Sequence, residues 1–176
     1  YDGLVTGAIA RQLQRILQDG KIEKIYQPEK DEIILHVNKG KEKHRLYISA
    51  NGSHARMHLT ANDHANPQNP MAFCMLLRKH FQGGRITVIR QVDSERIVEI
   101  HIDHINGMGF SVPKKLIVEI MGKHSNIIAL DDSGIILDCI KRISLDRNRY
   151  RQLLPGLPYV SPPDQSKVNL YTITED

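Results

Sequence analysis

Histidines are the side chains in this 176-residue chain with the most obvious potential for metal or acid–base chemistry. Nine are present, and the closest groups are His54 with His58 and His101 with His104. Strand residues two or four apart share a face, whereas residues three apart point to opposite sides, so His101 and His104 do not form a ready zinc site. Surface or hydrogen-bonded histidine is the more ordinary state at each position. We therefore expect no metal and no cofactor.

The carboxylates and glycines also fit no catalytic pattern. Glu95, Glu99 and Glu119 stand among strand-forming residues, where alternation alone points them outward. The sequence contains no GxxxxGK[ST], GxGxxG or GxSxG motif, so nucleotide cradles and hydrolase elbows of these types are unsupported. Three Phe and no Trp argue against an aromatic platform for single strands. The residues favour a binding module and not an enzyme.

A polar corner within residues 116–128 is the best candidate for a binding surface. Gly122 permits the backbone angles of a tight corner, and Lys123, His124, Ser125 and Asn126 follow it between two apolar runs. Polar side chains held between buried strands are displayed on a rigid frame. An ordinary hairpin turn with solvated residues would show the same pattern, and the residues alone favour that reading.

Basic residues are concentrated in a short segment near the end of the chain. The net charge is +4 with a pI near 9.1. Between residues 141 and 151 five cations face one anion, Asp146, so this segment carries an excess equal to that of the whole chain. It could face phosphates, or it could be a solvated, salt-bridged helix face. The cations are Lys141, Arg142, Arg147, Arg149 and Arg151.

Length and composition indicate one globular domain, with 40% hydrophobic residues available for a core. No apolar run approaches the ~20 residues that cross a bilayer, and no signal peptide opens the chain, so we expect a cytoplasmic protein without membrane contact. Cys74 and Cys139 have apolar neighbours and no CxxC spacing, which is typical of buried thiols.

The elements that must position these residues are helices and short strands. Asp2 can cap a helix that ends at Gly20, and a second helix is predicted over 71–82 with Asn69 as cap and Pro70 in its first turn. Short connections between the strand-like runs imply antiparallel meanders. The predicted strands are 21–27, 32–38, 44–49, 56–60, 85–91, 96–103, 114–121, 126–131 and 135–140.

An internal repeat relates the two halves. Residues 20–22, 25–27 and 33–34 match residues 84–86, 89–91 and 97–98 at an offset of 64, and Leu46 and 54–56 match Leu116 and 124–126 at an offset of 70. We predict an α+β fold of pseudo-duplicated helix-plus-antiparallel-sheet units that form a two-sheet sandwich with flanking helices. The repeat makes 53–56 a sister of the polar corner. The Pro-rich exit after Leu154 marks a boundary, with a domain over 1–163 and a linker stub over 164–176.

Several motifs together resemble the NFACT-N domain, the amino-terminal domain of the fibronectin-binding-protein-A-like family of ribosome quality-control factors. They occur in the family's order along nearly the whole chain. They are DG (2–3), KIYQP (24–28), SA (49–50), FCMLLRK (73–79), GGRI (83–86), VEIMGKHSNII (118–128), YR (150–151) and LPG (154–156).

The resemblance implies a fold like the amino-terminal domain of formamidopyrimidine-DNA glycosylases. Those enzymes use an amino-terminal proline as nucleophile, whereas Tyr1-Asp2-Gly3 stands here, so we expect binding without lyase chemistry. The resemblance also implies further helix-hairpin-helix, coiled-coil and NFACT-R domains after residue 176.

The family resemblance implies a function on the ribosome. Its members bind obstructed large ribosomal subunits carrying peptidyl-tRNA and recruit alanyl-tRNA, so that alanine tails are added to stalled chains without mRNA. Two family motifs fall on Glu95-Arg96, where the family has Asp-Arg, and on Glu119-Ile120-Met121. Arg96 suits a bidentate phosphate or base contact, and Glu119 could hold it. The predicted RNA-binding residues are Glu95, Arg96, Glu119, Ile120, Met121, Lys123, His124, Arg147, Arg149 and Arg151.

Two alternatives follow from the same resemblance. The family's older name suggests an anchorless surface adhesin that binds fibronectin, against which the lack of a signal or wall anchor counts. Residual activity on damaged DNA would need a nucleophile that the sequence does not offer.

Overall fold

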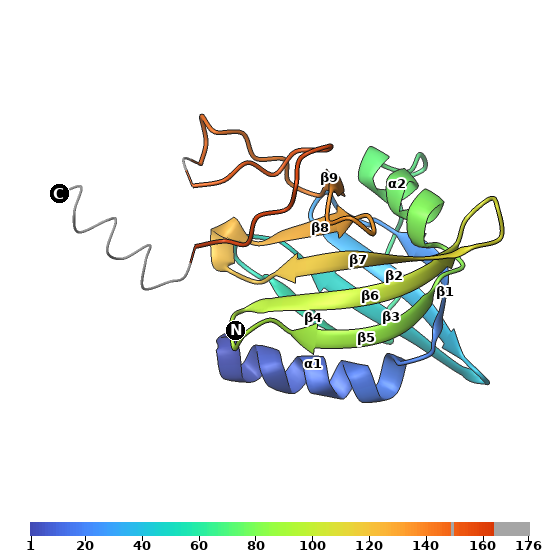
Figure 1. Ribbon diagram of the computed structural model, residues 1–176. Helices are drawn as coiled ribbons and strands as arrows, with labels where there is room; N and C mark the ends of the chain where they lie inside the picture. Colours follow the sequence, from blue (N-terminus) through green and yellow to red (C-terminus); the bar gives the residue numbers. More distant parts are fainter. Residues whose placement is uncertain (149, 164–176) are drawn as a thin grey trace.

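Two helix-plus-meander units follow one another along the chain (Figure 1). The computed structural model describes residues 1–148 and 150–163. The first unit comprises α1 (Gly3–Leu17), β1 (Lys21–Tyr26), β2 (Glu32–Lys39), β3 (Glu42–Ser49) and β4 (Arg56–Leu59). The second comprises α2 (Ala72–Phe81), β5 (Arg85–Gln91), β6 (Ile97–Ile105), β7 (Ser111–Glu119), the 3₁₀ turn η1 (Gly122–His124), β8 (Asn126–Leu130) and β9 (Ile136–Cys139).

The two helices begin differently. Asp2 caps α1 as predicted, because its Oδ1 accepts a hydrogen bond of 2.8 Å from the backbone N–H of Val5. The prediction that Asn69 caps α2 is wrong. The helix begins one residue after Met71, which occupies the N-cap position without a side-chain hydrogen bond. Asn69 therefore precedes the first turn by too many residues to reach its free N–H groups.

In the part of the chain that the structure describes, the strands form one antiparallel sheet of nine in the order β4-β3-β2-β1-β5-β6-β7-β8-β9. The α+β class is confirmed, but the halves are joined by hydrogen bonds at β1 and β5 instead of forming two separate sheets. Four backbone bonds repeat symmetrically across the junction, where Lys21 pairs with Arg85. They run from Ile22 N to Gly84 O (2.8 Å), Ile86 N to Gly20 O (2.9 Å), Asp19 N to Ile86 O (2.7 Å) and Gly83 N to Ile22 O (2.7 Å).

The sheet bends so that its halves face each other across one core (Figure 1). Apolar residues from both units meet there, for example Leu35 and Ile48 from the first and Ile100 and Leu116 from the second. Helix α1 packs on β5, β4 and β6, and α2 packs on β1, β9 and β6, so each helix contacts strands of both halves. Neither half would bury its apolar face alone. The two halves therefore pack against each other, as the two predicted layers would.

Strand registers confirm the repeat, with one correction. Ile25 pairs with Leu35 and Ile89 with Ile100, so β2 and β6 correspond at an offset of 65 and not 64. One additional residue in the β5–β6 connection produces the shift, so that Ile33 corresponds to Val98 in the main core and not to Ile97. The offset of 70 holds: Ser49 pairs with Arg56 in the first half, and Glu119 pairs with Asn126 in the second.

A second, smaller core lies on the outer face of β6–β9. Ile117, Ile128, Leu130 and Ile136 pack there under Leu153, which belongs to the segment after β9. Backbone bridges hold this segment in place, with Ile143 paired to Leu153 and Ile135 to Pro158. Among the described residues no helix is long and apolar enough to cross a membrane. The predicted linker, 164–176, and Arg149 lie outside the described residues.

Candidate functional site

The polar corner is a single 3₁₀ turn, η1, between β7 and β8. Gly122 opens it with φ +56°, a left-handed angle that favours glycine. The Ser125 hydroxyl closes it by accepting a hydrogen bond of 2.8 Å from the Met121 N–H. Lys123 and His124 are exposed, whereas Ser125 and Asn126 are buried. The turn therefore displays only the first two of the four predicted polar side chains.

Asn126 fastens the corner to the basic segment. Its side-chain amide donates to Lys141 O at 2.8 Å, and its Oδ1 accepts from Lys141 N at 3.1 Å and from Ile127 N at 2.9 Å. Lys141 in turn donates from Nζ to Ala50 O at 2.5 Å. Since every polar atom of this amide is used internally, Asn126 supports the corner and does not present a contact group.

The sister corner of the first half lies against η1. A Cβ built on Gly52 would be 3.2 Å from the Cα of Lys123, so the two backbones meet closely at this point. Gly52 and Gly122 correspond at the repeat offset of 70, and the duplication thus brings equivalent corners together. The backbone at Gly52 in the first half therefore supports η1 from one side, while β7 and β8 of the second half hold its two ends.

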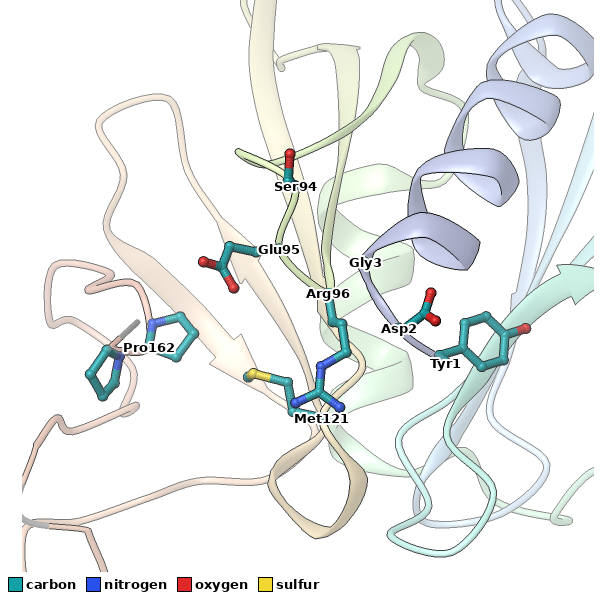
Figure 2. Close-up of a pocket in the computed structure, with 9 residues that line it drawn as sticks. Tyr1, Asp2, Gly3, Ser94, Glu95, Arg96, Met121 and Pro162 are labelled. Atoms are coloured by element: carbon teal, nitrogen blue, oxygen red, sulfur yellow. The ribbon is translucent and has the colours of Figure 1, made fainter. Parts of the chain in front are cut away.

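An open cleft lies beside the corner, with a volume of about 260 Å³. Figure 2 shows that it is bordered by the start of α1, the turn between β5 and β6, the residue before η1 and the end of the C-terminal segment. Its lining residues are Tyr1, Asp2, Gly3, Ser94, Glu95, Arg96, Met121, Pro162 and Pro163.

The β5–β6 turn is fixed tightly against α1. Asp93 and Ser94 have φ of 45° and 62°, as in two-residue hairpin turns of type I′. A Cβ on Gly3 would overlap the carbonyl oxygen of Ser94, so the helix can approach only with glycine there. Gln91 donates from Nε2 to the carbonyls of Gly3 and Glu95, at 2.7 Å each. The turn that carries the Glu95-Arg96 motif is therefore anchored to the first helical residue.

Arg96 is the cationic side chain of the cleft. Its carbonyl accepts from Ile120 N at 2.9 Å, which places its backbone beside the Glu119-Ile120-Met121 motif. Arg96 is half-buried, and its guanidinium has no hydrogen bond or ion pair with any residue of 1–148 and 150–163. Figure 2 shows it beside Met121, directed away from Glu95. Arg96 thus retains its donors for an external group.

Glu119 binds a different arginine from the one predicted. It lies opposite Ile97, one residue from Arg96, but its carboxylate takes the guanidinium of Arg151 through bonds of 2.8 and 2.5 Å. Tyr159 donates its hydroxyl to the same carboxylate at 2.6 Å. The prediction that Glu119 holds Arg96 is wrong, because the carboxylate points away from the cleft into the layer beneath the C-terminal segment.

This buried cluster has shifted proton affinities. Burial lowers the pKa of the Arg151 guanidinium, but the bond to Glu119 outweighs it and leaves the pKa above its ordinary value. Burial and the adjacent Glu119 carboxylate raise the pKa of the Tyr159 hydroxyl. Arg151 also donates to Val160 O at 2.9 Å, two residues before Pro162. The cluster therefore holds the segment that supplies the proline wall of the cleft.

The basic segment does not form one phosphate-facing surface. Lys141 is engaged with Ala50, Arg142 makes two bonds with Asp138 at 3.0 and 3.1 Å, and Arg151 is buried with a 4% exposed side chain. Arg147 is exposed, while Arg149 lies outside the described residues. Of the ten predicted RNA-binding residues, Glu95, Arg96 and Met121 come together in the cleft, and Lys123 and His124 follow at its edge. Ile120 is buried beside them.

Sequence reasoning missed two groups of residues here. Asp2 and Gly3 were recognised as a cap and a motif, but nothing in the sequence brings them to Arg96. Tyr159 and Pro162 carried no signal beyond that of a loop. Within the described part of the chain, no three His, Cys, Asp or Glu side chains are grouped to hold a metal ion.

The fold is that of an α+β domain in which one bent antiparallel sheet carries an open cleft. Residues 2–176 match the family described as NFACT N-terminal and middle domains, and the chain therefore belongs to the NFACT family. It is 41% identical to the Rqc2 homolog RqcH of Bacillus subtilis over 177 residues, which cover 100% of this chain and 31% of that protein. The chain thus spans about a third of the length of this curated relative.

Two further comparisons extend the relationship. Ribosome quality control complex subunit 2 of Saccharomyces cerevisiae is 26% identical over 78% of this chain and 12% of that protein. The crystal structure of the N-terminal domain of the fibronectin-binding protein PavA from Streptococcus pneumoniae superposes with a TM-score of 0.88 at 39% identity, covering 99% of this chain and 69% of that one.

Proposed function

We propose that this chain is the RNA-binding amino-terminal domain of a ribosome quality-control factor, without catalytic activity of its own. The names of its relatives support the ribosomal role. In the full-length protein, the domain would contact transfer RNA and the large ribosomal subunit in the cytoplasm. We further propose that the transfer RNA is alanyl-tRNA, recruited for mRNA-independent alanine tailing beside the obstructing peptidyl-tRNA.

The observation that carries the proposal is the guanidinium of Arg96, which has no partner among residues 1–148 and 150–163. Arginine presents a planar fork of donors that matches a phosphate or a guanine edge. A buried arginine that supports the fold needs a carboxylate partner, as Arg151 has in Glu119. Arg96 is instead held by its backbone at a cleft that Met121 also lines, and the exposed Lys123 and His124 follow Met121 in η1. This arrangement supports binding of an RNA backbone across the cleft and the corner.

Binding of full-length protein to transfer RNA over a salt series tests the proposal. We expect Arg96→Ala to weaken binding by about 1–3 kcal/mol and to reduce the salt slope by about one unit. Arg96→Lys should restore charge but not the bidentate geometry, and so recover only part of the affinity. Glu95→Asp, which restores the family residue, is expected to keep binding.

Arg85→Ala provides the matched control. Arg85 is half exposed at the opposite end of β5 and pairs with Asp19 and Asp103. It should leave the affinity for transfer RNA unchanged. If Arg96→Ala binds transfer RNA as tightly as the wild type, Arg96 is not part of the site. Binding that does not weaken as salt rises would contradict a phosphate interface altogether.

A second candidate function is adhesion to fibronectin, which the name of the PavA neighbour favours. Cell fractionation separates the two roles. Recovery of the protein only with large ribosomal subunits supports the first, whereas recovery at the cell surface supports adhesion.

A further inference from the structure

A separate polar groove lies on the outer face of β1–β4. Alternation in these strands turns Leu35, Val37 and Leu46 into the core and their neighbours outward. The groove is open and has a volume of about 750 Å³. Residues Leu59, Thr60 and Ala61 form one side, and its other lining residues are Lys24, His36, Asn38, Lys43, His44 and Arg45. None of the residues that line the cleft takes part in it.

The internal repeat shows how unusual this open face is for the molecule. In the second half, Ile117 pairs with Ile128 on the outer face, and Leu153 covers them. The equivalent pair in the first half is Tyr47 and His58, with polar and aromatic side chains. The duplicated face is therefore apolar in one half and polar in the other, where His64 and Arg56 cover the Tyr47 ring, 3% exposed, and the groove beside them is open.

The side chains that line the groove include three cations, Lys24, Lys43 and Arg45. Its lining contains no carboxylate, and Lys24 and Lys43 make no ion pair among residues 1–148 and 150–163. Arg45 binds Asp63, whose side chain is 90% exposed, and Glu42 contacts His44 at 3.2 Å from the edge. Burial, Arg45 and Lys24 together lower the pKa of His36 against the opposing effect of Asp63. Three carboxylates contact lining residues, Glu23 at Asn38, Glu42 at His44 and Asp63 at Arg45, so Lys24 and Lys43 are the cations of the lining without an ion pair among the described residues.

We propose that this groove binds the phosphodiester backbone of an RNA strand, as a second contact surface that is independent of the cleft. The inference rests on the proposed function, since RNA is the polyanion that the domain would meet. Lys24 and Lys43 can contact phosphate oxygens, Arg45 can exchange the exposed Asp63 for a phosphate, and the His36 imidazole can bond to phosphate or ribose oxygens. Such contacts add affinity without base specificity.

Lysine footprinting on the full-length wild-type protein tests the groove directly. The protein is acylated briefly with an N-hydroxysuccinimide ester, with and without saturating transfer RNA, and the modified lysines are quantified by mass spectrometry. We expect transfer RNA to reduce modification of Lys24 and Lys43 at least threefold. Lys41, exposed in the β2–β3 turn outside the groove lining, is the internal control and should react equally in both samples.

A charge-removal variant adds a quantitative arm. Lys24→Ala with Lys43→Ala should weaken binding of transfer RNA about tenfold near 0.1 M salt and lower the salt slope by about two units, whereas Lys41→Ala should not. Unchanged reactivity of Lys24 and Lys43 in an RNA-bound sample overturns the inference while the proposed function stands. Absence of any binding to transfer RNA contradicts the proposed function itself.

Discussion

At the residue scale, Glu119 is a structural carboxylate and not a contact group. It accepts from Arg151 and from Tyr159, and its side chain is completely buried. A buried ion pair is retained only when its remaining donors and acceptors are also satisfied, and Arg151 meets this condition by donating to Val160 O. The family motif at Glu119 thus positions the C-terminal segment that borders the cleft.

Removing one partner of this pair should be costly. Arg151→Ala leaves the Glu119 charge buried, for which the expected loss in unfolding free energy is about 3–5 kcal/mol. Tyr159→Phe removes one hydrogen bond to the charged group and should lose about 1.5–3 kcal/mol. Urea denaturation of the domain measures both.

Arg142→Ala is the comparison variant for these measurements. Its guanidinium pairs with Asp138, but its side chain is 60% exposed, so water replaces the lost contact. We expect little change in the denaturation midpoint. If Arg151→Ala proves no more harmful than Arg142→Ala, the buried pair does not hold the segment.

Alkaline pH should destabilise the domain through Cys139. Burial, with the charges of Asp138 and Glu119, raises the pKa of this thiol from 9.0 to about 12. Between these values the folded state binds more protons than the unfolded state, so the unfolding free energy falls as pH rises, by up to about 1.4 kcal/mol per unit. The stabilisation is fully present below pH 9.

Denaturation at pH 8 and near pH 10.5 measures this effect. Cys139→Ala should show a shallower decline than the wild type, and Tyr159→Phe should as well, since the pKa of that hydroxyl is also raised. Parallel declines in the wild type and both variants would assign the alkaline sensitivity to other groups.

At the element scale, two glycines allow β1 and β5 to join the halves. A Cβ on Gly20 would lie 2.5 Å from Val37 Cγ1 and 3.0 Å from Leu17 O, and one on Gly84 would lie 2.6 Å from Ile102 Cγ2 and 3.0 Å from Phe81 O. Each glycine ends the turn after a helix and accepts a hydrogen bond from the opposite half. In each half, the turn after the helix and the hydrogen bonds of the junction therefore meet at one glycine, Gly20 or Gly84.

Alanine at either junction glycine should destabilise the domain. Because the side-chain and backbone neighbours must both shift, we expect Gly20→Ala and Gly84→Ala each to cost about 1–3 kcal/mol. Gly107→Ala is the control, since its Cβ would meet nothing within 4 Å. Thermal or urea unfolding compares the three. A stable Gly84→Ala domain with unchanged midpoint would contradict the close approach at the junction.

At the scale of the whole molecule, the core belongs to both halves equally. Leu35 and Ile100 occupy equivalent registers and lie in the same cluster, together with Phe81 from the helix between them. Separating the halves would expose both apolar faces to water, at about 25 cal/mol per Å² of apolar surface. The structure therefore predicts a single cooperative unit with two repeats that depend on each other.

Dissection of the domain tests this dependence. A fragment of residues 1–70, which holds α1 and β1–β4, should remain unfolded alone, with poor amide dispersion by NMR and no cooperative transition in urea. The intact chain should show one transition by fluorescence and circular dichroism. A cooperatively folded fragment would mean that one half buries its apolar surface by itself.

The sequence by itself determined the elements and their repetition. Alternating apolar residues marked nine strands, Asp2 marked the start of α1, and matches between 20–22 and 84–86 indicated two equivalent units. These features are local, because strand periodicity, capping and turn chemistry depend on neighbouring residues. The NFACT family was also recognisable from motifs along the chain, and the match over residues 2–176 confirms it.

The tertiary structure alone decided which polar groups meet. Glu119 lies one register position from Arg96 yet binds Arg151, 32 residues away in sequence, and Arg96 remains unpaired beside Asp2 and Met121 within the described chain. The one-residue shift of β6 and the joining of β1 to β5 were equally invisible in the pattern. Each depends on the direction a side chain takes after the sheet bends, and that direction is set by packing between distant segments, which local periodicity does not encode.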